Sequence, residues 1–150
     1  MESYFNPLTL SAVLDAAKYA EYAMGMIKRG ESVPNAPGWK QARGYIDLAA
    51  NRLQSSMTNF GAFQNMAMGI IDELQSITKF VDARITVALA RGKYPRDDIE
   101  STAVRLQKVI RQIRAMFMKM DHTRSQRSIV KAASAVIKVA PYYGVRTAKR

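Results

Sequence analysis

The chain has 150 residues, of which 48% are hydrophobic, and its 23 Lys and Arg against 12 Asp and Glu give a formal net charge of +11. This apolar content argues against a chain that is disordered throughout, and the length suits one domain. The absence of Cys excludes disulfide frameworks, thiolate metal sites and cysteine nucleophiles, and a single His excludes multi-histidine metal sites. The composition therefore indicates the kind of binding partner more clearly than it indicates an enzymatic reaction.

Apolar residues recur at helical spacing along the first two thirds of the chain. The first predicted helix spans residues 6–29, with Asn6 as N-cap and Pro7 as the first helical residue. Gly and Pro residues in the range 30–38 indicate a loop. Two further helices are predicted over residues 39–60 and 62–91, and one uninterrupted helix through Gly61 is the alternative. Trp39, at the start of the second helix, is expected to anchor the core.

The last two predicted helices span residues 97–120 and 124–140. Asp97 with Glu100 has the spacing of a capping box, and Thr123 with Gln126 repeats this pattern. Pro141 is expected to end the last helix, because the residue before a proline disfavours helical geometry. The predicted fold is all-α, with about five helices in a single helical domain over residues 1–140 and a basic tail over 141–150. The helices form a bundle or extended hairpins, with a basic C-terminal pair.

The excess positive charge lies in the last third of the chain. Residues 1–92 hold 9 basic and 8 acidic side chains, whereas residues 93–150 hold 14 basic and 4 acidic ones. In each of the last two predicted helices, the basic residues fall on one arc of the helical wheel and the apolar residues on another. The predicted nucleic-acid-binding residues are Arg105, Lys108, Arg111, Arg114, Lys119, Arg124, Arg127, Lys131, Lys138, Arg146, Lys149 and Arg150.

Such a one-sided charge distribution favours a polyanionic partner. Ordinary solvated helix faces mix charges of both signs, because like charges repel and opposite charges at i,i+4 stabilise. Basic side chains spaced along a helix suit contact with phosphates rather than the reading of base edges, so binding is expected to be independent of nucleotide sequence. An anionic membrane surface, an acidic protein partner and a merely solvated basic face are the alternatives.

Few residues indicate other chemistry. Tyr94, Tyr142 and Tyr143 could stack on bases, although packing at a core edge or subunit interface explains them as well. The acids around Asp97 and those at 72–73 are explained by helix capping and by exposure, and His122 by a position between helices. Motifs for nucleotide, metal-hydrolase or serine-hydrolase chemistry are absent from the sequence. The protein is therefore expected not to be an enzyme and to need no metal, cofactor or small-molecule substrate.

A small, cysteine-free helical chain with this basic surface resembles the major coat proteins of filamentous and rod-shaped DNA viruses of archaea. The resemblance rests on Arg105, Lys108, Arg111, Arg114, Arg124, Arg127 and Lys131 on amphipathic helices. It implies helical subunits, commonly dimers, that wrap double-stranded DNA in A-form or B-form into a helical filament, with the basic faces lining its lumen. The basic extension would be C-terminal, whereas some such proteins have a basic N-terminal arm.

The sequence therefore predicts a structural protein that packages DNA, a viral nucleocapsid subunit that associates with itself or with a homologous subunit. A small dimeric architectural or regulatory DNA-binding protein and a helical adaptor for an acidic protein are the alternatives. The sequence has no run of 18 apolar residues and no basic, cleavable leader at its start, so neither a transmembrane segment nor a signal peptide is expected. The expected location is the virion, or otherwise the cytoplasm.

Overall fold

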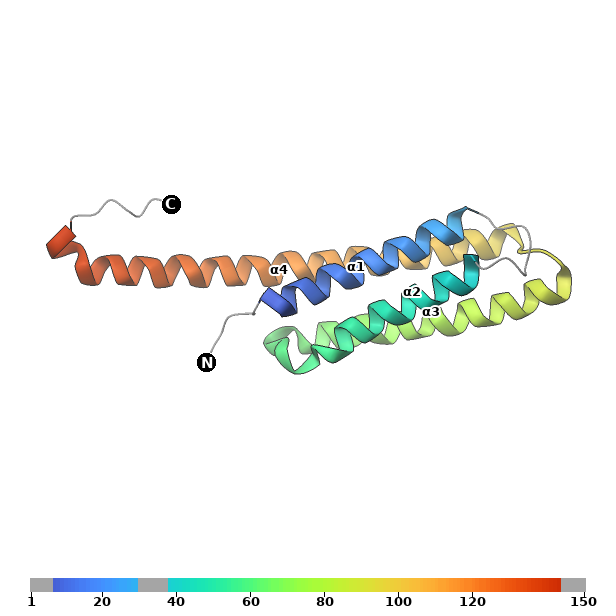
Figure 1. The fold of residues 1–150 in the computed structure, drawn as a ribbon, viewed down its shortest axis with the longest axis horizontal. Helices are drawn as coiled ribbons and strands as arrows, with labels where there is room; N and C mark the ends of the chain where they lie inside the picture. The colour runs from blue at the N-terminus through green and yellow to red at the C-terminus, as the bar shows by residue number, and fades with distance from the viewer. Residues whose placement is uncertain (1–6, 30–37, 144–150) are drawn as a thin grey trace.

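The computed structural model describes residues 7–29 and 38–143, with side chains up to residue 123. Within these ranges the chain forms four α-helices and two short 3-10 turns, and it contains no strand, which confirms the all-α fold (Figure 1). The elements are α1 (Pro7–Lys28), α2 (Gly38–Ser55), η1 (Met57–Asn59), η2 (Gly61–Phe63), α3 (Gln64–Arg91) and α4 (Arg96–Tyr143).

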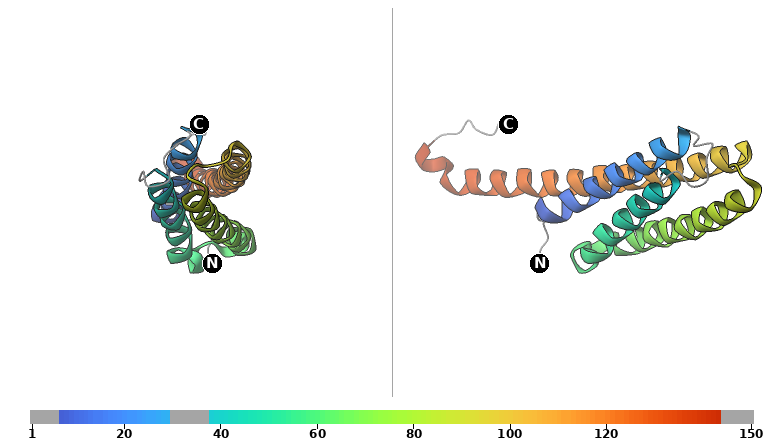
Figure 2. Two further views of the ribbon diagram at one scale, coloured as in Figure 1. Left: turned by 90° about the vertical axis from the view of Figure 1, so that its right-hand side faces the viewer. Right: turned by 45° about the vertical axis from the view of Figure 1, so that its right-hand side comes forward.

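The four helices form an antiparallel bundle in which each helix runs opposite to the one before it (Figure 1). In the end-on view of Figure 2 the helices stand at four corners, with α1 beside α2 and α4, and α3 beside α2 and α4. The pair α1 and α2 packs most extensively, and the pair α3 and α4 packs least. The side between α3 and α4 is therefore the loosest side of the bundle.

The core combines close helix packing with a few large side chains. Small residues on α1 and α2 let these two helices approach closely, and Ala16 and Ala42 are fully buried in the core. Trp39 is fully buried, as predicted, and its ring stacks on Tyr94 with 4.2 Å between ring centroids. This stack joins the start of α2 to the turn that precedes α4.

One stripe of α4 faces the bundle. Its buried residues are separated alternately by four and three residues, which is the pattern that keeps one side of a helix in contact with antiparallel neighbours. The stripe consists of Thr102, Leu106, Val109, Ile113, Met116 and Met120, all with no exposed surface. The apolar arc predicted for residues 97–120 is therefore the core face of α4.

The predicted division between the last two helices is wrong, because α4 is one helix of 48 residues. It begins at Arg96, one residue before the predicted N-cap, so Asp97 lies in the first turn and Glu100 pairs with Arg96 instead of closing a capping box. Thr123 does not start a new helix either. Its Oγ1 donates a hydrogen bond of 2.9 Å to the carbonyl oxygen of Lys119, a bond within the helix that leaves the helix unbroken.

Pro141 also fails to end α4, which continues to Tyr143. A proline costs most in the middle of a helix, where it removes a hydrogen bond and its ring clashes with the preceding turn. Here only two further helical residues follow it, and Figure 1 shows the end of α4 bent away from the axis of the helix. The structure therefore has four α-helices in the described residues where about five were predicted.

Gly92 ends α3 in a left-handed conformation, with φ of 82° and a hydrogen bond of 2.7 Å from its amide to the carbonyl oxygen of Ala88. A side chain at this φ is strained, so we expect Gly92→Ala to lower the free energy of unfolding by about 1 kcal/mol. Gly25→Ala is the matched control: it lies inside α1 with open space around an added Cβ, so it should stabilise instead. Urea unfolding of both variants checks the opposite signs.

Candidate nucleic-acid interface

Five of the twelve predicted binding residues have described side chains, and all five lie on the part of α4 that packs in the bundle. They divide into two groups according to their contacts. Arg105 and Arg114 bind acids on neighbouring helices, whereas Lys108, Arg111 and Lys119 are exposed and form no ion pair with another described residue. Only the second group has its charge free for a partner.

Arg105 ties α4 to α3. Its guanidinium donates to Glu73 at 3.2 Å and to the Ser76 hydroxyl at 3.0 Å, and it lies 5.4 Å from the centroid of the Phe80 ring. The guanidinium of Arg84 also lies over the Phe80 ring, 5.3 Å from its centroid, and forms an ion pair of 3.5 Å with Asp98. These contacts close the half of the α3–α4 side that is nearest the Gly92 turn.

Other arginines of the bundle are used in the same way. Arg114 pairs with Glu21 across α4 and α1. Arg52 pairs with Asp15 across α2 and α1 at 2.7 Å, and Arg43 pairs with Asp82 across α2 and α3 at 2.5 Å. The hydrogen bond and the charge of Asp82 raise the pKa of Arg43 above its ordinary value. Most acids in the described bundle are thus neutralised by arginines, which leaves the lysines as the main source of free positive charge.

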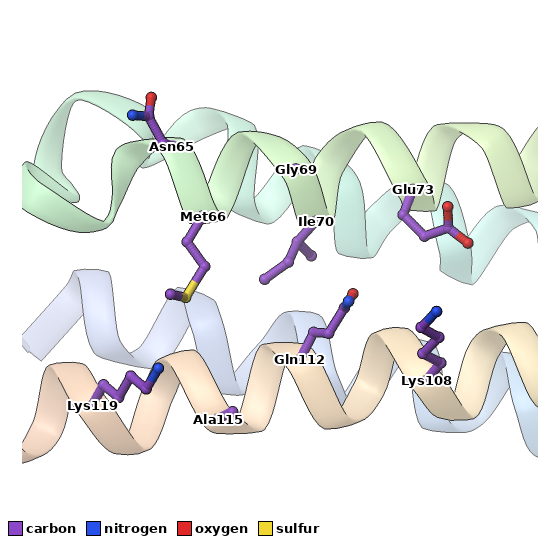
Figure 3. Close-up of a pocket in the computed structure, with 9 residues that line it drawn as sticks. All are labelled: Asn65, Met66, Gly69, Ile70, Glu73, Lys108, Gln112, Ala115 and Lys119. Carbon is purple, nitrogen blue, oxygen red and sulfur yellow. The ribbon is translucent and has the colours of Figure 1, made fainter.

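Lys108 and Lys119 line a groove between α3 and α4 with a volume of about 540 Å³. Figure 3 shows both lysines and Gln112 extending from α4 toward α3, while Met66 and Ile70 extend from α3 toward α4. The remaining lining residues are Asn65, Gly69, Glu73 and Ala115. No pattern in the sequence predicts this groove, because it forms where two helices separate and neither helix carries a local signal at that point.

The other seven predicted binding residues have no described side chains. The backbone of α4 is helical at Arg124, Arg127, Lys131 and Lys138, but their side chains lie outside the described residues, and Arg146, Lys149 and Arg150 lie outside them entirely. The first four are on the part of α4 that continues past the beginning of α1 and past the turns between α2 and α3 (Figure 1). No described helix of the same chain lies along that end of α4.

The continuity of α4 changes how its basic positions relate to each other. At about 100° per residue, with Arg105 at 0°, positions 108, 111, 114 and 119 fall between about 180° and 320°. Positions 124, 127, 131 and 138 fall between about 40° and 100°. The sequence predicts two basic helices, each with its own outward basic face. The structure has one helix instead, and its two basic arcs lie on roughly opposite sides.

The other residues considered for a functional role are the three tyrosines, His122 and the acidic side chains. Tyr94 is buried against Trp39 and is therefore not available to stack on bases, and Tyr142 and Tyr143 have side chains outside the described residues. His122 is exposed on α4. Across residues 7–29 and 38–123, no group of three or more His, Cys, Asp or Glu side chains is arranged to hold a metal ion. None of the described helices combines the length and apolar character that crossing a bilayer requires.

Comparison with known proteins gives no relative: no protein-family model matches the chain, and no curated protein or solved structure matches it significantly. The distribution of charge, the groove and the long helix are therefore the features that bear on function.

Proposed function

We propose that this protein is a structural nucleic-acid-binding protein that packages DNA without sequence preference, as a coat subunit of a helical nucleocapsid. The observation that carries the proposal is the distribution of charge over the fold. The first 92 residues are almost neutral, and in the bundle most described acids are paired with arginines. From residue 101 onward the sequence has 12 basic residues and one acid, Asp121.

The shape of α4 supports a polyanion as the partner. The helix is about 72 Å long, and its end beyond Met120 extends for about 35 Å. Duplex DNA carries about one charge per 1.7 Å of its axis, so each of the two basic arcs of α4 can meet several phosphates in succession. A small acidic ligand would need basic groups that converge on one point, whereas these positions are spread along a rod.

The test is the affinity for duplexes of unrelated sequence as a function of salt. If about six basic side chains contact phosphates, the logarithm of the binding constant should fall with the logarithm of salt concentration at a slope of about −5, and should be alike for all sequences. Fluorescence anisotropy with labelled duplexes measures this slope. A slope near zero, or strong preference for one sequence, would contradict the proposal.

Electron microscopy of the protein with and without DNA separates the coat from the two alternatives. Long regular filaments that protect DNA from nuclease support the coat subunit. Discrete dimers on DNA would favour an architectural or regulatory protein, and binding to an acidic protein in preference to DNA would favour an adaptor.

A further inference from the structure

The groove between α3 and α4 has the features of a binding site for another helix. Its floor includes Met66, Ile70 and Ala115, and Met66 is 39% exposed although it points toward α4. Gly69 has no heavy atom within 4 Å of where its Cβ would be, so a helix backbone can approach closely at this point. Lys108 and Lys119 flank this floor and could lay their aliphatic stems along an apolar helix while their ammonium groups stay in water.

The far end of α4 carries an apolar stripe on the same side of the helix as this groove. On the wheel used above, groove positions 108, 112, 115 and 119 fall between about 280° and 340°. Positions 129, 130, 133, 136, 137 and 140, which are Ile, Val, Ala, Val, Ile and Ala, fall between about 220° and 340°. The groove and the apolar positions are therefore consecutive parts of one side of α4, and each is about three turns long.

We propose that two copies of this chain pair antiparallel through this side of α4, so that residues 129–140 of each copy occupy the α3–α4 groove of the other. A two-fold axis near residue 124 places position 133 of one copy opposite Ala115 of its partner, and position 136 opposite Gln112. Such a contact is self-complementary, as a two-fold interface requires. Each groove then receives a fifth helix, and the apolar positions of the projecting end are covered.

The pairing also brings the separated basic arcs together. Within one chain, positions 124, 127, 131 and 138 lie on the side of α4 opposite to the groove. When the apolar side of this segment enters the groove of a second copy, the basic side faces outward, beside the exposed Arg111 of that copy. The inference concerns assembly of the protein alone and can fail or hold independently of nucleic-acid binding.

Disulfide cross-linking tests the register, because the chain has no cysteine of its own. We expect a mixture of the single variants Ala115→Cys and Ala133→Cys to form a cross-linked dimer on oxidation, seen on a non-reducing gel. Each variant alone should not cross-link, because two copies of one position lie about 27 Å apart in the antiparallel pair. Mixing Ala115→Cys with Arg127→Cys is the matched control, since position 127 lies on the opposite arc.

The experiment is done without nucleic acid and in 0.5 M salt, where phosphate contacts are weak and repulsion between the basic copies is screened. Cross-linking of the 115–133 mixture no greater than that of the 115–127 mixture would overturn the inference. As a second measurement, Ala115→Trp fills the groove at an exposed position and should weaken dimerisation at least tenfold by sedimentation, with the helical content unchanged. Dimerisation at the affinity of the unmodified chain would overturn the inference as well.

Discussion

Replacement of Arg124, Arg127, Lys131 and Lys138 with Gln is expected to reduce the affinity for duplex DNA by about four-thousandfold at 0.1 M salt. Each phosphate contact contributes a salt slope of about −0.9, which corresponds to roughly eightfold in affinity at this salt concentration. The slope itself should become shallower by about 3 to 4. Both quantities follow from anisotropy titrations over a series of salt concentrations, and circular dichroism checks that the variant remains helical.

The matched control removes four positive charges elsewhere. Lys28, Lys40, Lys79 and Arg91 are exposed on α1, α2 and α3, and none of them forms an ion pair with another described residue. Their replacement with Gln changes the net charge of the chain by the same amount, so it measures the effect of overall charge alone. Equal losses of affinity for the two quadruple variants would contradict a binding surface on α4 and would leave only a general attraction between a basic protein and DNA.

Trp39→Ala is expected to lower the free energy of unfolding by about 3–5 kcal/mol, the range found when a large aromatic side chain is removed from a core. Trp39 has no exposed surface, and its stack on Tyr94 holds α2 against the turn before α4. The loss should lower the melting temperature by about 10 °C or more. Thermal and urea unfolding, followed by circular dichroism, measure both values.

Leu89→Ala serves as the comparison for this core variant. Leu89 is also apolar and lies in a helix, but it is 52% exposed, and substitutions at such surface positions change stability by about 0.5 kcal/mol or less. A Trp39→Ala variant that unfolds at the same denaturant concentration as Leu89→Ala would mean that the Trp39–Tyr94 stack does not hold the bundle together.

Part of this organisation could be predicted from local patterns. The spacing of apolar residues such as Leu106, Val109 and Ile113 predicts both a helix and its buried face, because burial of one side of a helix repeats with the helical period. The burial of Trp39 follows from its size and its position at the start of a helix. The concentration of basic residues after residue 101 is a property of the composition and needs no structure.

Local patterns did not predict where the last helix ends or which charged side chains form ion pairs. The Thr123–Gln126 spacing is that of a helix start, yet the Thr123 hydroxyl bonds within a continuous helix, because the same group can satisfy either arrangement. Arg105 and Arg114 are on the predicted basic arc of their helix, but their acids, Glu73 and Glu21, are on other helices. A helical wheel of one element cannot contain that information.

The helical character of the chain, the apolar face of residues 97–120 and the concentration of positive charge in the last third can all be inferred from residues that are neighbours along the chain. The pairing of arginines with acids, the projection of α4 past the bundle and the groove between α3 and α4 became visible only in the fold. These properties depend on how helices distant in the sequence meet, and contacts of that kind leave no periodic signal in the sequence.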